Sequence, residues 1–205
     1  SGRDIEQVVV YLPEPVDSGA LRDAWAAAIA RHEALRLVFT WRDGVPAQQV
    51  SEPTGPDWTE LDWSERPPAD RDAELAAWLA KDRRRGFDLA ARPPHRHTLI
   101  RCGARDYLLI WTFHHLLLDG RALPIVLDEV FRGAADGATP SFLAYARDLA
   151  ARDRAPAERY WRSYLRDLED IAPVTLFDPP PVLPTDGEST HAEAAATATL
   201  ATSSP

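Results

Sequence analysis

The sequence predicts an α+β fold, or a loosely layered α/β sandwich, in which a mixed sheet is packed by helices. Short segments rich in β-branched and apolar residues stand beside longer segments whose apolar residues recur every three or four positions. The two kinds of segment do not alternate regularly, as they would in a doubly wound parallel sheet. The 205 residues are 45% hydrophobic, which suffices for one sizeable core.

The first strand and the first helix are indicated by their patterns and by their end signals. Residues 6–12 form a β-branched run that is closed by prolines, which lack the donor that a sheet ladder needs. From Ser18 onward the apolar residues recur at helical steps through Ile29, and Asp17 or Ser18 can cap the first free amides. A strand followed by an amphipathic helix is therefore expected.

A β-hairpin is predicted next. Residues 35–41 and 45–50 are two strand-like segments, and the Asp43-Gly44 dipeptide between them favours a tight two-residue turn. The proline-rich stretch 51–68 predicts an irregular surface segment anchored by its tryptophans. Helical spacing returns over residues 69–84, and the basic residues and glycine that follow suit a helix C-terminus.

The middle of the chain predicts a buried pair of strands, residues 95–102 and 107–114, joined by a polar turn. The second segment is almost entirely apolar, as is typical of a central strand covered on both faces. Helical spacing then marks residues 123–131, 141–150 and 156–168. Residues 171–205 are rich in Pro, Ala and Thr and predict a linker, with a strand possible within 192–200.

Composition excludes several classes of protein. A formal net charge of −9 and a pI near 5.1 disfavour binding to nucleic acid, whose phosphates require clustered basic residues. No apolar run approaches the ~20 residues that cross a bilayer, so no membrane association is expected. The single cysteine, Cys102, cannot form an internal disulfide, which favours a cytoplasmic location. The chain lacks methionine and starts directly before a strand, so we expect a piece of a longer protein.

The residues most suited to chemistry are His114 and His115, at the end of the most apolar strand and before Asp119 and Gly120. A rigid strand end can hold a polar group at a cleft, although a histidine placed there is more often a hydrogen-bonded core residue. His115 and Asp119 could share a metal, but a catalytic metal needs about three protein ligands and no third one is apparent. A serine hydrolase is disfavoured because the chain lacks a Gly-x-Ser-x-Gly elbow.

Taken together, these motifs resemble the condensation domains of non-ribosomal peptide synthetases, in the chloramphenicol acetyltransferase-like superfamily. The His-His-x-x-x-Asp-Gly pattern at 114–120 is accompanied by an Arg-His-Glu-x-Leu-Arg segment that begins at Arg31, with Leu37 in place of the usual threonine. Phe-Asp-Leu at 87–89 and Tyr160-Trp161 also match, and the order agrees over residues 5–170.

The resemblance implies a domain of two lobes arranged in a V. Residues 1–170 would form the N-terminal lobe, a chloramphenicol acetyltransferase-like mixed sheet packed by helices. Residues 171–205 would be a linker or crossover toward a C-terminal lobe that this chain lacks, so the chain alone is expected to be inactive. No cofactor or metal would be bound directly. The substrates would be carried on the phosphopantetheine of donor and acceptor peptidyl carrier proteins.

The resemblance also assigns roles to residues. His115 would be the catalytic residue, either as a general base or by orienting the attacking amine, and His114 would support it by packing. Asp119 would pair with Arg36 or Arg31 in a largely buried turn, and Gly120 would adopt a positive φ or approach the substrate. Two alternatives stay open: an acyltransferase of the same superfamily that uses a free or coenzyme A-bound donor, and a non-catalytic docking domain.

Several arginines stand out against the acidic background and permit two interpretations. They could form a docking surface for an acidic carrier protein, or they could be solvated helix faces paired with Asp82, Glu158 and Asp167. The residues concerned are Arg83, Arg84, Arg85, Arg159, Arg162 and Arg166.

Overall fold

The computed structural model describes residues 4–134, 137–166 and 197–199. These residues fall into two compact units, one comprising 4–143 with 197–199 and the other 144–166. The sequence predicted one lobe through residue 170; that boundary and most of the predicted linker lie outside the described residues and stay predictions.

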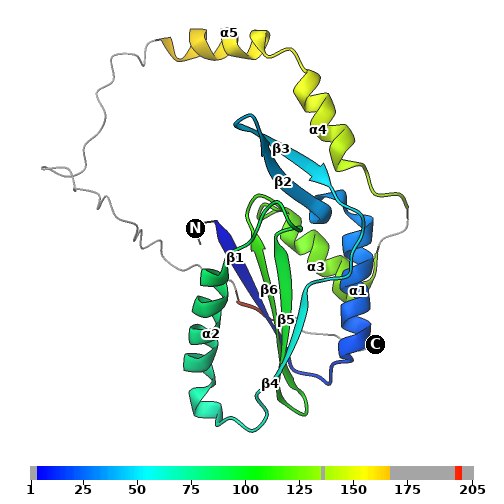
Figure 1. Ribbon diagram of the computed structural model, residues 1–205, viewed down its shortest axis with the longest axis vertical. Helices are drawn as coiled ribbons and strands as arrows, with labels where there is room; N and C mark the ends of the chain where they lie inside the picture. The colour runs from blue at the N-terminus through cyan, green and yellow to red at the C-terminus, as the bar shows by residue number, and fades with distance from the viewer. Residues whose placement is uncertain (1–3, 135–136, 167–196, 200–205) are drawn as a thin grey trace, which may run out of the picture. The chain divides into compact units, whose positions relative to one another are not determined.

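The larger unit is built on a five-stranded mixed sheet with the order β4-β5-β6-β1-β7 (Figure 1). The central strand β6 is antiparallel to both of its neighbours, whereas the two outermost strands pair in parallel with the strands beside them. The strands are β1 (Ile5–Leu12), β4 (Trp58–Asp62), β5 (His95–Gly103), β6 (Asp106–His114) and β7 (Thr197–Thr199). The predicted mixed sheet and its apolar central strand are confirmed.

The edge strand β4 corrects the sequence prediction, which placed an irregular segment at 51–68. Trp58 pairs with His97 and Asp62 with Arg101, in parallel register. Prolines surround this five-residue strand, and its pairing partner lies about forty positions further along the chain. Such a strand carries little local signal because its stability comes from a non-local ladder.

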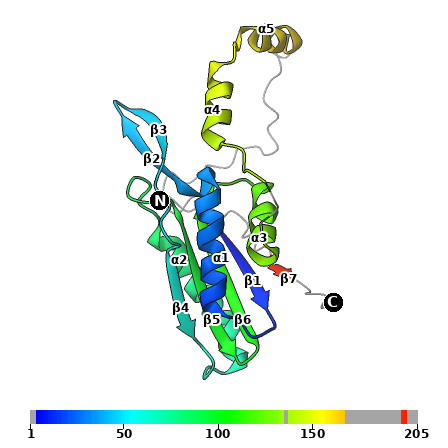
Figure 2. The same ribbon diagram turned by 90° about the vertical axis from the view of Figure 1, so that its right-hand side faces the viewer.

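Helices cover both faces of the sheet (Figures 1 and 2). On one face lie α1 (Ser18–Arg31) and α3 (Ala122–Arg132), and on the other lies α2 (Arg71–Arg85), preceded by the short helix η2 (Pro68–Asp70). The side chain of Asp17 accepts the Ala20 amide at 3.0 Å, which identifies Asp17 as the N-cap of α1.

The core has two parts because side chains alternate across the strands. Val8 and Val10 face α1 and α3, whereas Val9 faces α2. On the α1 side, His97 is enclosed by aromatic rings, with centroids 4.1 Å from Trp25 and 6.2 Å from Trp111. Burial lowers the pKa of His97, and that of its neighbour His95 to about 4, so both imidazoles are neutral core side chains.

A buried polar network fastens α2 to the sheet. The Asp82 carboxylate accepts hydrogen bonds from Arg96 Nε at 2.6 Å, from Thr112 Oγ1 at 2.8 Å and from Gln7 Nε2 at 3.1 Å. Arg96 also donates to the backbone carbonyls of Asp82 and Gly86. Asp82 was expected to pair with surface arginines; instead it faces the sheet, where burial makes its partners necessary.

The predicted hairpin is confirmed as β2 (Leu37–Arg42) and β3 (Val45–Val50), which follow the short helix η1 (Glu33–Arg36). Asp43 and Gly44 both have positive φ, 51° and 77°. These are the angles of a type I′ turn, whose twist matches that of a hairpin.

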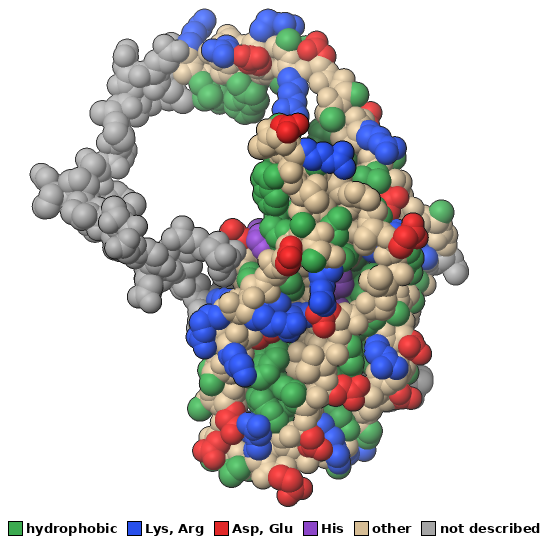
Figure 3. All heavy atoms as spheres, in the orientation of Figure 1, with side chains coloured by type: hydrophobic (Ala, Val, Ile, Leu, Met, Phe, Trp, Pro, Cys, Tyr) green, Lys and Arg blue, Asp and Glu red, His purple; other side chains and the backbone are tan. Residues whose placement is uncertain are grey.

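The smaller unit contains most of α4 (Phe142–Ala151) and all of α5 (Ala155–Tyr164). Tyr160, Trp161 and Tyr164 are exposed, and hydrophobic side chains gather along α5 in Figure 3. Arg162 forms an i,i+4 pair with Glu158 at 2.7 Å, as the solvated-helix interpretation predicted for that arginine. Among the described residues no helix is long and apolar enough to span a membrane.

Candidate active site

The histidine pair is held by backbone hydrogen bonds from both neighbouring strands. His114 ends β6, and its amide donates to the Pro94 carbonyl at 2.9 Å, just before β5. The His115 amide donates to the Asp4 carbonyl at 2.7 Å, just before β1. The Leu117 amide closes the turn onto the His114 carbonyl at 3.0 Å. The start of the motif is thus fixed by three hydrogen bonds before any side chain contributes.

His114 is half-buried, and its ring belongs to the turn. The Leu116 amide donates to His114 Nδ1 at 3.2 Å, so Nδ1 carries no proton and the neutral ring is protonated at Nε2. Partial burial and the adjacent His115 lower the pKa of His114, against the opposing charge of Asp4. A ring that already accepts a backbone hydrogen bond fits the supporting role that the sequence predicted for it.

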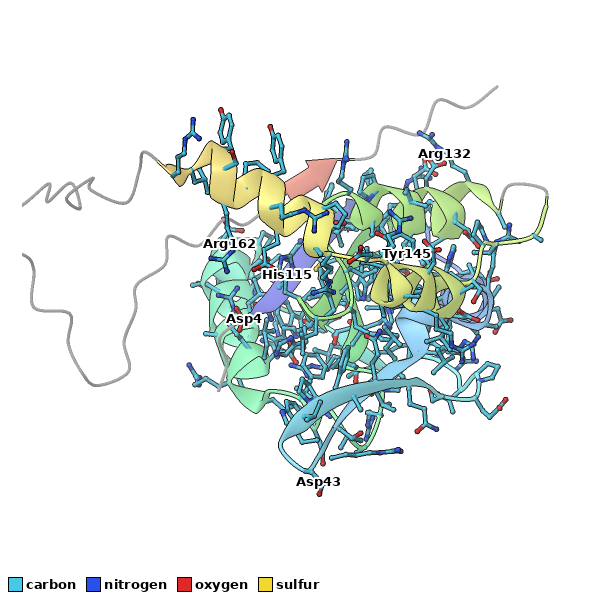
Figure 4. The ribbon with its side chains drawn as sticks, turned by 90° about the horizontal axis from the view of Figure 1, so that it is seen from above. Asp4, Asp43, His115, Arg132, Tyr145 and Arg162 are labelled. Atoms are coloured by element: carbon cyan, nitrogen blue, oxygen red, sulfur yellow. The ribbon has the colours of Figure 1, made fainter. Side chains whose placement is uncertain are left out.

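His115 is exposed, and within the described residues its side chain makes no hydrogen bond or ion pair. Its ring is therefore available to a ligand, while its backbone is anchored. Figure 4 shows His115 at the same end of the sheet as Asp4. A neutral imidazole in this position can accept a proton or a hydrogen bond from a bound amine.

Asp119 does not pair with Arg36 or Arg31, so that prediction is wrong. The Asp119 carboxylate is exposed and accepts the amides of Arg121 and Ala122 at 3.0 and 3.1 Å, which begins α3. Arg36 donates to the Ser51 carbonyl at 2.7 Å, and Arg31 contacts Glu129 and the Gly137 carbonyl. A solvated carboxylate that accepts backbone amides in the turn before a helix needs no buried counter-charge.

At Gly120 only the first of the two predicted alternatives, a positive φ, is contradicted. Its φ lies outside the positive range, and a Cβ built at this position would meet no atom within 4 Å. The backbone of this lobe therefore does not require glycine at position 120. An approach of substrate to Gly120 stays a prediction.

Residues outside the motif complete the site, and the sequence analysis missed them. Asp4 and Pro94 supply the carbonyls that hold the histidine pair, and only the pairing of β6 with both neighbours reveals their roles.

Two cavities lie away from the histidine pair. One, of about 320 Å³, is lined in part by His95, and the other, of about 330 Å³, is lined in part by the segment that joins β1 to α1. In the described part of the chain, no group of three His, Cys, Asp or Glu residues could hold a metal ion.

Fold and site together define a mixed sheet packed by helices on both faces, which presents an imidazole directly after its central strand. Residues 5–199 match the family model of the condensation domain. The chain belongs to the condensation-domain family.

Similar proteins of known function are much longer than this chain. A linear gramicidin synthase from Brevibacillus parabrevis is 37% identical over 163 residues, which cover 75% of this chain and 3% of that protein. Phosphinothricin tripeptide synthetase PhsC from Streptomyces viridochromogenes is 32% identical over 201 residues, 90% of this chain and 18% of that protein. This chain therefore spans only a small part of each synthetase.

Solved condensation domains share the fold. The starter condensation domain of the rhizomide synthetase RzmA superposes with a TM-score of 0.70 at 20% identity, covering 83% of this chain and 44% of that chain. A structure describing condensation domain-mediated chain release from the enacyloxin polyketide synthase gives a TM-score of 0.67 at 24% identity, covering 81% and 34%. This chain spans less than half of either structure.

Proposed function

We propose that this chain is the N-terminal lobe of a condensation domain that forms an amide bond within a non-ribosomal peptide synthetase. The family match over residues 5–199 and the synthetases among its relatives support this assignment. Both substrates would be thioesters on the phosphopantetheine arms of donor and acceptor carrier proteins. A C-terminal lobe would supply the opposite wall of the site, and we place the synthetase in the cytoplasm.

The observation that carries the proposal is an exposed His115 ring on a backbone whose amide is held by the carbonyl of Asp4, just before β1. In the reaction, the acceptor's α-amine attacks the donor thioester carbonyl, a C–N bond forms, the C–S bond breaks, and the amine proton is lost as the thiol leaves. The His115 imidazole would accept that proton or orient the amine. Holding two tethered reactants in attack geometry can contribute about 7–11 kcal/mol, whereas a general base contributes about 10²- to 10⁴-fold in rate. Positioning is therefore the larger effect.

The test replaces His115 with alanine in the intact condensation domain and measures product from carrier-bound substrates. We expect turnover to fall while condensation stays measurable, since the positioning of the two thioesters is retained. Leu116→Ala is the matched control, because Leu116 is the exposed neighbour in the same turn. A wild-type rate for His115→Ala would exclude His115 from catalysis, whereas a wild-type domain that forms no product would favour a docking domain.

A second candidate differs in the donor. One of the similar solved structures is a mutant of the starter condensation domain of the rhizomide synthetase RzmA in complex with C8-CoA, so a coenzyme A-bound donor is a specific alternative. The intact domain is assayed with the same acyl group on a carrier protein and on coenzyme A. We expect the carrier-bound donor to react faster; equal or faster reaction of the coenzyme A donor would favour the alternative.

A further inference from the structure

The segment Arg31-His32-Glu33 has no part in the histidine site. Arg31 was one of two predicted partners of Asp119, and it contacts other groups instead. Arg31 ends α1, His32 follows as its C-cap, and Glu33 begins η1. All three side chains contact one later stretch of the chain, from the last turn of α3 to the start of α4.

Arg31 and His32 hold the end of α3 and a residue that follows it. Arg31 Nε lies 3.4 Å from Glu129 Oε1, and His32 Nε2 lies 2.7 Å from Glu129 Oε2, so one carboxylate joins both side chains. Arg31 also donates to the Gly137 carbonyl at 2.9 Å. The Glu129 side chain is only 13% exposed, so its contacts are screened less by water than ion pairs on open helix surfaces.

Glu33 binds the start of α4. Its Oε2 accepts the Leu143 amide at 2.9 Å and the Ser141 hydroxyl at 2.8 Å. The first amides of a helix have no acceptor within the helix, and the helix dipole favours a negative charge there. The Leu143 amide and, next, the Ser141 hydroxyl lower the pKa of Glu33, which keeps the carboxylate ionised at neutral pH. Glu33 thus caps α4 from a distant part of the chain.

The bond to Leu143 lies at the boundary between the two compact units. The larger unit ends at Leu143 and the smaller one begins at Ala144, within the first turn of α4. Hinge motions are absorbed by a few residues in loops or at the ends of elements. A contact that fixes the last residue of one unit therefore determines where the chain between the units can bend.

We propose that Arg31, His32 and Glu33 form a clamp that holds the end of α3 and residues 137–143 on the larger unit, with Glu33 fixing the point at which α4 leaves it. The clamp acts on the course of the backbone and takes no part in condensation chemistry. It goes beyond the proposed function, and its test needs no substrate.

The experiment uses substitutions of Glu33 in the full chain. Glu33→Ala removes the acceptor at the start of α4, whereas Glu33→Gln keeps a side-chain oxygen that can accept. Ser141→Ala, at an exposed position, removes only the hydroxyl donor. Glu74→Ala is the matched control, because it removes a carboxylate in the first turn of α2 that pairs with Arg66.

Two measurements report on the start of α4. Hydrogen exchange of the Leu143 amide is followed by NMR, with the Ile110 amide in the buried strand β6 as the reference for general unfolding. Limited cleavage by chymotrypsin after Phe142 is followed by mass spectrometry, with cleavage after the exposed Tyr164 in α5 as the internal reference.

We expect Glu33→Ala to speed exchange of the Leu143 amide and cleavage after Phe142 about tenfold each, because local opening then no longer breaks the clamp. Ser141→Ala should speed both by about threefold, since the bond to the Leu143 amide remains. Glu33→Gln should stay within about twofold of wild type. Glu74→Ala should leave both rates unchanged, as should every variant at Ile110 and Tyr164.

Unchanged exchange at Leu143 and unchanged cleavage after Phe142 in folded Glu33→Ala would overturn the clamp. An equal rise at Leu143 and Ile110 would also overturn it, because general destabilisation would then explain the result. Should Glu33→Ala fail to fold, Ser141→Ala decides the matter, and wild-type rates in that variant would contradict the clamp. None of these results depends on the turnover of His115→Ala.

Discussion

Acid should unfold this protein through two buried histidines. His95 and His97 are 5% and 1% exposed and lie on the α1 side of the sheet. His95 Nε2 lies 3.0 Å from the Leu35 carbonyl, and neither ring nitrogen of His97 has a hydrogen-bond partner. Protonating either ring places a charge among aromatic side chains. Burial therefore lowers both pKa values, that of His95 from 6.5 to about 4.

The sign and the size of the effect of pH on the free energy of unfolding follow from proton linkage. Between the unfolded pKa of 6.5 and the folded pKa of about 4, the unfolded chain binds more protons, so the free energy of unfolding falls as the pH falls through this window. Between pH 8 and pH 5, His95 alone accounts for a loss of about 2 kcal/mol, since one pKa unit corresponds to about 1.36 kcal/mol. His97 adds to the loss in the same direction.

The assay is urea unfolding at pH 8 and at pH 5, followed by tryptophan fluorescence, because Trp25 and Trp111 contact His97. Carboxylates also titrate in acid, so His95→Gln, which stays uncharged throughout, isolates the histidine contribution. We expect this variant to lose about 2 kcal/mol less than the wild type between the two pH values. His97→Phe should flatten the dependence as well, because it fills the same aromatic site. Identical losses in wild type and both variants would refute the reasoning.

Three further predictions concern α2 and the turn after β6, each measured by urea unfolding. Asp82→Ala leaves Arg96 buried without its partner and should cost about 3–5 kcal/mol, whereas Asp148→Ala removes an exposed i,i+4 pair and should cost less than about 1 kcal/mol; equal losses would contradict the buried network. Asp119→Ala removes the acceptor of the Arg121 and Ala122 amides and should cost about 1 kcal/mol; no loss would show that these two hydrogen bonds are unimportant for stability. Gly120→Ala should stay within about 0.5 kcal/mol of wild type, and a larger loss would contradict an unstrained backbone at this position.

Local patterns predicted most elements of the larger unit. The period-2 and helical spacings, the Asp17 cap and the Asp43-Gly44 turn are properties of neighbouring residues, and each led to the observed strand, helix or hairpin. β4 was missed because its five residues gain stability only by pairing with β5. A short segment among prolines has little preference of its own until a partner strand is present.

The residues of the candidate site were likewise predicted only in part from the sequence. The order of residues along the chain was enough to select His114 and His115, because a polar pair at the end of an apolar strand is visible in sequence and matches a family motif. The partners of these residues were not visible. Asp119 was expected to need an arginine because its turn was taken to be buried, and the structure shows the carboxylate exposed and bonded to the Arg121 and Ala122 amides.

The sequence by itself thus determined most of the elements, the family and the choice of His115 as the candidate residue. The tertiary structure alone decided which groups surround that histidine. Asp4, Pro94 and His115 are far apart along the chain, and they meet only because β1 and β5 flank β6. The burial of Asp82 likewise depends on α2 lying across the sheet. Solvation, and hydrogen bonds between residues distant along the chain, are properties of the packed molecule, so no local pattern encodes them.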